Sequence, residues 1–332
     1  MLQYSHMRIL TGIQPTNILH IGNLFGALRP AIDLQREHEL FMMVADYHAI
    51  TVNHDPKQLH SNILFTAAAY IAAGINPKKT VLFQQSAVPA HTELGWVMQS
   101  VARIGEAKRM TQFKDKSGAK EDTVSVGLLT YPMLMTADIL LYDAEGVPVG
   151  DDQKQHVELT RDLAERFNRD YGQTFVVPKP MIRKHGARLK SLTEPERKMS
   201  KSAPSAKSYI SLTDDPDVVV KKVRSAVTDS ERGIHYTAER PGLHNLLTIL
   251  SLLEYAPADE IAARYQEQGM KSLKDDLSER LVEHLRPIRE EIDNLMNNKD
   301  ELTRMIANGT AAATKVADQK MQQVRKNIGV AL

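Results

Sequence analysis

The 332-residue sequence contains no cysteine. This absence excludes disulfide bonds, thiolate zinc sites, iron–sulfur clusters and a cysteine nucleophile, and it fits a reducing compartment. Aromatic residues are scarce, at 5% of the chain, so the composition gives little sign of a surface on which nucleic-acid bases stack. No apolar run approaches the roughly 18 residues of a membrane span, and the N-terminus does not resemble a signal peptide. We therefore expect a cytoplasmic protein with no membrane partner.

A marked excess of either charge is also absent. Lys and Arg number 42 against 41 Asp and Glu, which gives a net charge of +1 at pH 7. A polyanionic partner would therefore be held by local basic patches and not by the field of the whole protein. The length predicts about two domains, and the composition, with 42% apolar residues, is typical of a globular protein.

Strand-like and helix-like segments alternate along the first part of the chain. The expected strands are Arg8–Gly12, Leu40–Val52 and Thr80–Ser86. Asp55 as N-cap, Pro56 and Gly74 delimit one helix, and a second is expected over about Gly22–His38, where Pro30 should kink or shorten it. Apolar strands separated by helices indicate a parallel sheet covered on both faces, with ligands bound beyond the C-terminal strand ends.

The remainder of the chain changes character near Leu212. A polar basic loop, an apolar segment, a charged helix and a last strand are expected at Arg103–Lys120, Val124–Tyr142, Asp152–Asn168 and Thr174–Ile182. Most of the chain after Leu212 has a helical pattern. The prediction is an α/β fold, a Rossmann-like doubly wound parallel sheet over residues 1–212, followed by a C-terminal all-helical domain over residues 213–332. The single tryptophan, Trp96, lies in a helical pattern and is expected in the core.

The segment GIQPTNILHIGN, residues 12–23, forms the first strand-to-helix loop. It contains neither of the two common glycine-rich phosphate loops. Free backbone N–H groups at Gly22 and Asn23, together with the positive end of the helix, would bind an anion. His20 adds a donor, and Gly22 allows a close backbone approach. On these residues alone, a capped turn with a solvated histidine is the simpler interpretation.

The segment KMSKS, residues 198–202, places two lysines among small hydroxyl residues. The compact ammonium groups of Lys198 and Lys201 suit phosphate oxygens as point charges. From Lys179 to Lys201 there are eight Lys and Arg against two acidic residues. Taken alone, this segment also fits an ordinary solvated basic loop.

Together, the HIGN and KMSKS segments resemble the paired motifs of class I aminoacyl-tRNA synthetases. Nearly the whole chain is similar to the bacterial tryptophanyl branch of that family, through GIQPT, DYHAIT, MTQFKDKS, GLLTYPMLMTADILLYD, VPVGDDQKQHVELTRDLAERFN and SAVTDS. The run that begins VPVG differs from the corresponding run of the tyrosyl branch. The resemblance implies an enzyme that activates L-tryptophan with Mg²⁺–ATP, releases pyrophosphate and transfers tryptophan to tRNA(Trp). It also implies a homodimer with contacts from an insertion over about 88–141, and a C-terminal domain that reads the anticodon.

The resemblance further implies three sets of site residues and no metal held by the protein. The phosphate-contacting catalytic residues would be His20, Lys198 and Lys201. The other ATP-binding residues would be Gln14, Pro15, Thr16, Gly22, Asn23, Lys116, Gly150, Asp151, Asp152, Leu189, Met199, Ser200 and Ser202. The tryptophan-binding residues would be His48, Tyr131, Met135, Asp138 and Gln153.

The physical chemistry of the residues agrees with an amino-acid pocket around Asp138. Tyr131, Met135 and Asp138 are spaced i, i+4 and i+7, on one face of a helix. A lone acid in so apolar a segment is costly unless it is paired. An indole nitrogen can only donate a hydrogen bond, so its partner must accept one. The alternatives are an Asp138 that caps or forms an ion pair, and Tyr131, Met135 and His48 as core residues.

Several assignments keep a simpler alternative. One of the two aspartates before the Asp152 helix would only cap it, and Lys116 would be a flexible surface lysine. His20 stands where tryptophanyl enzymes often have threonine, Asn23 replaces the last histidine of the class motif, and Ala203 stands where an aspartate is common. If that aspartate normally anchors the KMSKS loop, its absence would loosen closure on ATP.

The C-terminal helical pattern carries a basic cluster that could contact tRNA phosphates. Its members are Lys315, Lys320, Arg325 and Lys326. The alternative is a solvated helix face. The sequence leaves three other functions open: a tyrosyl-type synthetase on the same fold, a paralogue that forms adenylates without charging tRNA, and a non-catalytic tRNA-binding module.

Overall fold

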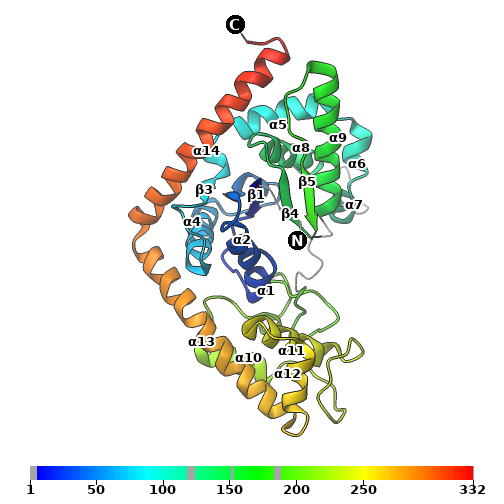
Figure 1. Ribbon diagram of the computed structural model, residues 1–332, viewed down its shortest axis with the longest axis vertical. Coiled ribbons are helices and arrows are strands. Elements are labelled where there is room, and N and C mark those ends of the chain that lie inside the picture. The colour runs from blue at the N-terminus through cyan, green and yellow to red at the C-terminus, as the bar shows by residue number, and fades with distance from the viewer. Residues whose placement is uncertain (1–5, 118–123, 151–152, 183–187, 332) are drawn as a thin grey trace.

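One parallel sheet forms the centre of the computed structural model, which describes residues 6–117, 124–150, 153–182 and 188–331 (Figure 1). Its strands are β1 Arg8–Ile13, β2 Glu39–Val44, β3 Val81–Gln84, β4 Gly146–Val149 and β5 Lys179–Ile182. They pair in the order β3-β2-β1-β4-β5, all parallel. The predicted doubly wound Rossmann-like sheet is confirmed. The order reverses at β1, so the loop after β1 lies at the switch point where such sheets bind ligands.

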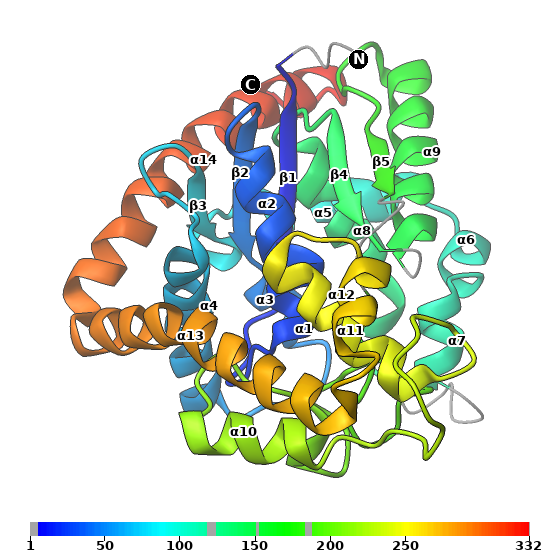
Figure 2. The ribbon, with the colours of Figure 1, turned by 60° about the horizontal axis from the view of Figure 1, so that its bottom comes forward.

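Helices cover both faces of this sheet (Figure 2). They are α1 Ile21–Asn23, α2 Arg29–Leu34, α3 Asp46–Ala49, α4 Pro56–Ala73, α5 Ala90–Val101, α6 Ile104–Lys108, α7 Thr111–Ser117, α8 Val126–Leu140 and α9 Lys154–Tyr171. Successive β2 side chains enter two different cores: Leu40 and Met42 pack with α4, whereas Phe41 and Met43 pack with α5, α8 and α9. A strand buried on both faces must be apolar throughout, which is what the β2 sequence shows.

Two local predictions are confirmed in the first half of the chain. Asp55 caps α4 by accepting a hydrogen bond from the Lys57 N–H at 2.9 Å, and Gly74 ends the helix at φ 118°. Between α1 and α2 the backbone takes a π-helical turn over Leu24–Leu28, and Pro30 lies in the first turn of α2. Proline has no N–H to donate, so the predicted interruption of this helix falls directly before it.

The strand expected over Leu40–Val52 is shorter than predicted. It ends at Val44, and Asp46–Ala49 form the short helix α3. The cause lies across the fold. The buried Asp46 carboxylate accepts hydrogen bonds from the Ser86 N–H at 2.9 Å and from the Gln84 side-chain amide at 2.7 Å, which turns the chain at the sheet edge.

The loop expected over Arg103–Lys120 is wrong, because this stretch contains α6 and α7. Glu106 accepts a hydrogen bond from the Arg103 N–H at 2.9 Å at the start of α6, and it forms an ion pair with Arg166 of α9 at 2.5 Å. Met110 and Phe113 are buried in the core below. These few apolar residues are enough to dock a polar helical segment that has little amphipathic pattern of its own.

After β5 the described chain forms helices and turns, together with two isolated β-bridges, Lys190 with Lys198 and His20 with Ser211. The helical elements are the short 3₁₀ turn Ala206–Ser208 and the helices α10 Pro216–Arg224, α11 Pro241–Glu254, α12 Ala258–Tyr265, α13 Gly269–Asn297 and α14 Lys299–Asn327. The core on the α4 face of the sheet continues into α10, α11 and α13. The long helix α14 returns along the sheet beside β3 (Figure 1) and joins the opposite core through Ala313 and Met321. The division near residue 212 stays a prediction.

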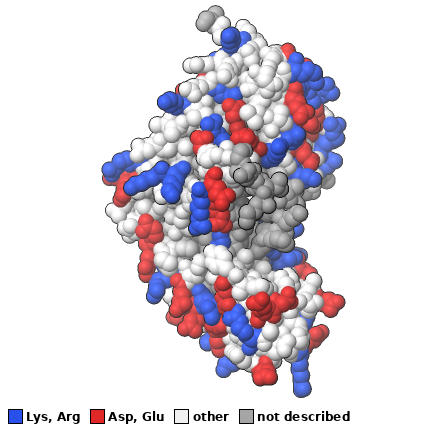
Figure 3. Space-filling view, viewed as in Figure 1, with Lys and Arg blue, Asp and Glu red and all other residues white. Residues whose placement is uncertain are grey.

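Two members of the predicted basic cluster are structural. Lys320 is buried, donates to the Thr174 carbonyl at 2.7 Å and pairs with Asp143 at 2.7 Å. Arg325 makes a bidentate pair with Glu93 of α5 at 2.7 and 2.6 Å. Both hold α14 against the α/β part. The ammonium of Lys320 is buried there, which contradicts its expected contact with tRNA, whereas the Arg325 side chain is 41% exposed and its contact with tRNA stays a prediction. Over the face shown in Figure 3, basic and acidic side chains are interspersed.

The core position expected for Trp96 is also wrong, because its side chain is 70% exposed. The buried residues of α5 include His91, Leu94 and Met98, which recur at helical spacing along one face. Trp96 falls outside that spacing and faces away from the core. A helical pattern rich in apolar residues therefore indicated burial without telling which of its large side chains is buried.

Close packing of α14 on β3 predicts a large effect of Gly309→Ala. A Cβ at Gly309 would lie 1.8 Å from the Leu82 carbonyl oxygen, so α14 must move away from the sheet. Replacing glycine by alanine inside a helix stabilises the helix by about 1 kcal/mol. A loss of stability in Gly309→Ala would therefore come from the contact with Leu82 and not from helix propensity. We expect the free energy of unfolding to fall by about 1–3 kcal/mol in urea titrations followed by circular dichroism. Asn308→Ala, at an exposed position of α14, is the control; a gain in both variants would contradict this packing.

Candidate active site

The loop after β1 ends in a capped turn at His20. The His20 Nδ1 accepts a hydrogen bond from the Gly22 N–H at 3.1 Å, and Asn23 Oδ1 accepts one from the His20 N–H at 3.0 Å. The Asn23 N–H donates to the His20 carbonyl at 2.8 Å. The expected free N–H groups at Gly22 and Asn23 are therefore already engaged, and that expectation is wrong. The histidine is not solvated either, because it is 6% exposed.

The environment of His20 keeps its imidazole neutral. Burial, together with the positive charges of Lys198 and Lys201, lowers the pKa of His20 from 6.5 to about 4. Because Nδ1 accepts the Gly22 hydrogen bond, the proton of the neutral ring is assigned to Nε2. His20 therefore offers an anion a hydrogen bond and no charge, so a positive charge must come from elsewhere.

The KMSKS segment supplies that charge and contacts the first loop. Lys201 Nζ donates a hydrogen bond to Thr16 Oγ1, and burial lowers the pKa of Lys201. The Met199 N–H donates to the Leu189 carbonyl at 2.9 Å, and both side chains are buried. A Cβ at Gly22 would lie 3.8 Å from the Met199 Cβ, so the two motifs approach each other closely.

Backbone pairing fixes this approach. The Ile21 N–H donates to the Ile210 carbonyl at 3.0 Å, and the Leu212 N–H donates to the Leu19 carbonyl at 2.9 Å. These bonds pair the first loop with the segment after KMSKS. The structure thus brings together the residues of HIGN and KMSKS, which the sequence places far apart.

A cavity of about 280 Å³ opens beside this junction. Its lining includes Gln14 and Pro15 of the first loop, Lys201, and the start of α4. Three of the predicted nucleotide residues therefore share one cavity beyond the C-terminal end of β1. The side chains of Leu189 and Met199 are buried, at 2% exposed each, and pack in the core. Ser200 and Ser202 bond each other through their hydroxyls at 2.8 Å.

The predicted amino-acid pocket centres on a fully enclosed carboxylate. Asp138 of α8 is 1% exposed, and its Oδ2 lies 2.6 Å from His48 Nε2 of α3. Its Oδ1 lies 2.6 Å from His91 Nδ1 and accepts a hydrogen bond from Gln85 Nε2 at 2.8 Å. Burial raises the pKa of Asp138, but the interaction with His48 and the hydrogen bonds from both histidines lower it more, to below its ordinary value. The carboxylate is ionised.

Reasoning from the sequence missed Gln85 and His91. They follow β3 in the run QQSAVPAH, where neither their spacing nor their composition distinguishes them from core residues. His48, predicted at the end of a strand, instead lies in α3, and the structure brings it to Asp138. The close contacts with His48 and His91 also supply the pairing that the alternative interpretation of Asp138 required. Oδ2 nevertheless has one hydrogen-bond partner, His48, although a carboxylate oxygen can accept two hydrogen bonds.

The remaining residues predicted to bind tryptophan lie on α8 and before α9. The Tyr131 hydroxyl donates to Gln112 at 3.0 Å and lies 2.7 Å from His156 Nε2, and burial raises the pKa of Tyr131 to about 12. The Tyr131 and His48 rings meet edge to face, with centroids 6.2 Å apart. Met135 is half-buried against the same core. The backbone N–H of Gln153 donates to the Gly150 carbonyl at 3.0 Å, at the C-terminal end of β4.

Three predicted residues are not tested by this geometry. Asp151 and Asp152 lie outside the described residues, and so does the side chain of Lys116, whose backbone belongs to α7. Within the described ranges, no group of three or more His, Asp or Glu side chains is placed to hold a metal ion. None of the helices described there is long and apolar enough to cross a bilayer.

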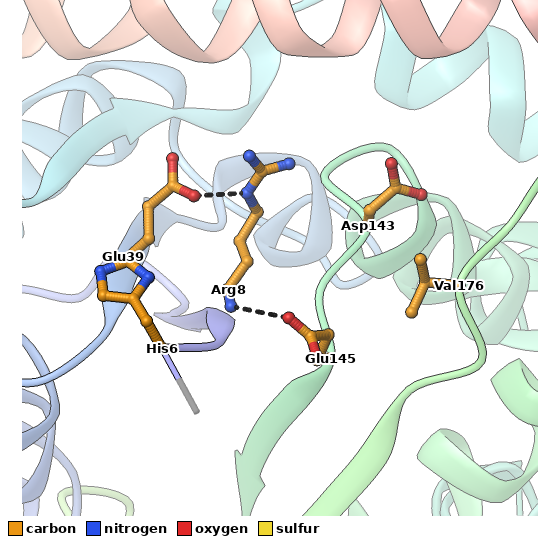
Figure 4. Close-up of a pocket in the computed structure, with 6 residues that line it drawn as sticks. All are labelled: His6, Arg8, Glu39, Asp143, Glu145 and Val176. Atoms are coloured by element: carbon orange, nitrogen blue, oxygen red, sulfur yellow. Dashed lines mark hydrogen bonds and ion pairs between the residues drawn. The ribbon is translucent and has the colours of Figure 1, made fainter. Parts of the chain in front are cut away.

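A second cavity, of about 290 Å³, lies at the opposite edge of the sheet (Figure 4). Arg8, Glu39 and Glu145 line it at or beside the starts of β1, β2 and β4, and Arg8 Nε pairs with Glu39 at 2.8 Å. This cavity lies at the amino ends of the strands, whereas parallel sheets of this kind bind ligands beyond the carboxyl ends. No predicted site residue lines this cavity, and we assign it no part in the reaction.

Comparison with known proteins places these residues in a family context. Residues 3–286 match the family model of tRNA synthetases class I (W and Y). A tryptophan–tRNA ligase of Bacillus anthracis is 50% identical over 323 residues, which span 97% of this chain and 98% of that protein. The crystal structure of tryptophanyl-tRNA synthetase from Mycoplasma pneumoniae superposes with a TM-score of 0.89 at 35% identity, over 98% of this chain and 99% of that one. The corresponding Campylobacter jejuni structure, complexed with ADP and tryptophan, has a TM-score of 0.84 at 35% identity, over 97% and 100%.

The lowered pKa of His20 predicts a specific pH dependence of stability. The unfolded chain binds a proton at this residue between pH 6.5 and about 4, where the folded chain does not, so stability is lost as the pH falls through this window. His20→Gln removes this pH-dependent contribution to the free energy of unfolding. The difference in unfolding free energy between wild type and variant should shrink, by up to about 3 kcal/mol, from pH 6.5 to 4.

Urea titrations at fixed ionic strength measure this difference. His60→Gln, at an exposed position of α4, is the matched control and should keep a constant separation from wild type. A constant separation for His20→Gln as well would show that the buried imidazole is not held neutral.

Proposed function

The chain belongs to the class I tRNA synthetases of the W and Y family, and from this premise we propose that it is a ligase of L-tryptophan and tRNA(Trp). It activates tryptophan with ATP to tryptophanyl-adenylate, releasing pyrophosphate, and transfers the acyl group to the tRNA. The observation that carries the proposal is the contact between the first loop and KMSKS at the switch point of the sheet, in a chain 50% identical to a tryptophan–tRNA ligase over nearly its full length. We expect this reaction in the cytoplasm, where charged tRNA is consumed.

Activation needs positioning and charge compensation more than a side-chain nucleophile. The tryptophan carboxylate attacks the α-phosphorus of ATP, so no protein group has to be deprotonated. The neutral His20 donates a hydrogen bond from Nε2 to the transferring phosphate, while Lys198 and Lys201 compensate the negative charge of the other phosphates. Mg²⁺ enters as part of the ATP complex, as a component of the substrate.

Binding of ATP must change one contact in this arrangement. Lys201 lines the same cavity as Gln14 and Pro15, and its Nζ already donates to Thr16 Oγ1. Phosphate oxygens are stronger acceptors for an ammonium than a hydroxyl, because both partners are charged. Lys201 therefore transfers from Thr16 to the phosphates as the KMSKS loop closes, and it returns when product leaves.

Recognition of the amino acid rests on Asp138. An indole N–H can only donate, and an ionised carboxylate can only accept, so the two are matched in kind. Asp138 Oδ2 has one neighbour, His48, and retains capacity for a second donor. A tyrosine phenol both donates and accepts, so this lone acceptor favours tryptophan over the tyrosyl alternative. The presence of both phosphate motifs favours a catalytic protein over a tRNA-binding module.

The partner surfaces are assigned on exposure and charge. Trp96, Ile104 and Val126 lie in the segment over about 88–141 and are 70%, 74% and 74% exposed. Large apolar side chains exposed to this degree are typical of protein interfaces, which supports a homodimer formed through this segment. Residues 1–212 carry the reaction and residues 213–332 bind the anticodon. Lys315 and Lys326 are exposed on α14 and remain candidates for tRNA phosphates.

Amino-acid-dependent exchange of pyrophosphate into ATP tests the substrate. Wild-type protein should support exchange with tryptophan and not with tyrosine. Asp138→Ala should raise the tryptophan KM about tenfold or more, because the indole N–H loses its charged acceptor, and leave the ATP KM unchanged. Asp33→Ala, at an exposed position of α2, is the control. An unchanged tryptophan KM in Asp138→Ala would remove the pocket assignment, and exchange without aminoacylation of tRNA(Trp) would favour the adenylate-forming paralogue.

Single-turnover formation of the adenylate tests His20. Because a hydrogen bond that strengthens in the transition state is lost, His20→Ala should slow this step by more than about tenfold at saturating tryptophan and ATP. His20→Asn retains a side chain suited to capping α1 but cannot reach the place of Nε2, so it should be equally slow. Recovery of the rate in His20→Asn, or a smaller loss in His20→Ala, would reduce His20 to a helix cap.

A further inference from the structure

The two oxygens of Asp138 are occupied unequally. Oδ1 has two neighbours, His91 Nδ1 at 2.6 Å and Gln85 Nε2 at 2.8 Å, whereas Oδ2 has one, His48 Nε2 at 2.6 Å. A carboxylate offers about two acceptor positions on each oxygen. Oδ1 therefore accepts two hydrogen bonds from the protein, and by this count Oδ2 has capacity for one more. Which oxygen faces a ligand depends on the groups that hold Oδ1.

The His91 ring contacts Oδ1 through Nδ1, and this contact fixes which ring nitrogen carries a proton. Its Nδ1 faces an ionised carboxylate, which only accepts, so Nδ1 must carry a proton. Its Nε2 lies 2.7 Å from the Tyr142 hydroxyl. Burial and the charge of Asp138 raise the pKa of Tyr142, so this hydroxyl keeps its proton. The Tyr142 hydroxyl can therefore donate to Nε2 while His91 donates from Nδ1 to Asp138.

The surroundings of His91 leave its ring one orientation. Both His91 and Tyr142 are completely buried, and the imidazole stacks on Phe83 with centroids 5.9 Å apart at an angle of 25°. His91 is the second residue of α5, and its N–H donates to the Val88 carbonyl at 3.2 Å. A flipped ring would leave buried polar atoms without partners, which is costly.

Gln85 is fixed in the same way. Its Oε1 accepts a hydrogen bond from the Tyr47 N–H at 3.0 Å, so its amide nitrogen must point to Asp138. Tyr47 belongs to α3, which also carries His48. Both donors to Oδ1 are thus oriented by a second bond of their own, and neither touches the other oxygen.

We propose that His91, oriented by Tyr142, is a positioning residue that holds Asp138 Oδ1 and so leaves the free position of Oδ2 for the indole N–H of tryptophan. The inference rests on the proposed function, because it assumes that Asp138 receives the indole. His91 does not touch the substrate. His91 contributes to the choice of amino acid. Without His91, the Asp138 carboxylate can rotate towards other donors. The enzyme then no longer distinguishes an amino acid whose ring has an N–H from one whose ring lacks it.

The test compares tryptophan with an isosteric amino acid in which sulfur replaces the indole N–H, in the pyrophosphate exchange assay. The measured quantity is the ratio of kcat/KM for tryptophan to kcat/KM for the sulfur analogue. In His91→Leu this ratio should fall about tenfold or more, through the tryptophan KM, with the ATP KM unchanged. His91→Asn, whose amide nitrogen replaces Nδ1 as donor, should recover most of the ratio. Tyr142→Phe, which removes only the donor to Nε2, should lower it about threefold.

A matched control separates positioning from stability. Tyr265→Phe removes another buried tyrosine hydroxyl that bonds a carboxylate, that of Asp276 in α13, far from the site in sequence. It should lower stability without changing the ratio. If His91→Leu and Tyr142→Phe reduce kcat/KM equally for both amino acids, as lost folding would, the inference is overturned. Should His91→Leu not fold, an unchanged ratio in Tyr142→Phe overturns the inference equally.

The outcome also distinguishes this inference from the proposed function. A wild-type protein without tryptophan-dependent exchange would overturn the function itself. A wild type that favours tryptophan and an Asp138→Ala that loses the preference, with His91→Leu retaining it, would overturn the role of His91 alone.

Discussion

Backbone pairing between the first loop and the segment after KMSKS is the constraint on which the candidate site depends. The Ile21 N–H bonds the Ile210 carbonyl, and the Leu212 N–H bonds the Leu19 carbonyl. His20 lies between these bonds, and Lys201 reaches back to Thr16 from the other side of the junction. Because the sheet order reverses at β1, this pairing fixes the lysines where a doubly wound sheet binds its ligand. Without this backbone pairing, the distance between the first loop and the KMSKS segment would not be fixed.

A second constraint is the buried charge of Asp138. An ionised group away from water must be surrounded by donors, and here they come from three separate elements: His48 from α3, Gln85 from the turn after β3, and His91 from α5. The same need explains local structure that propensity does not. The chain after β2 turns into α3 and does not continue as a strand, and its Asp46 is bonded to the residues just after β3.

Local signals in the sequence were sufficient where one element decides the outcome. Asp55 and Gly74 delimited α4, and Pro30 marked the interruption before α2, because caps and proline act within a few residues. Signals failed where burial depends on a distant element. The stretch from Arg103 to Lys120 is polar, yet α6 and α7 form because Met110 and Phe113 find a core and Glu106 finds Arg166. Trp96 is exposed, and Lys320 is buried against Asp143, for the same reason.

The sequence by itself determined the α/β class, the two motifs proposed for phosphate contact, and an acid of the kind that an indole N–H requires, since these depend on residue type and short-range spacing. Only the tertiary structure decided that Gly22 and Asn23 have no free N–H groups, that His20 is buried and neutral, and that Asp138 has one oxygen filled and one with capacity to spare. The physical reason is that hydrogen-bond occupancy and desolvation are set by every group within a few ångströms, and those groups come from strands and helices far apart in the chain.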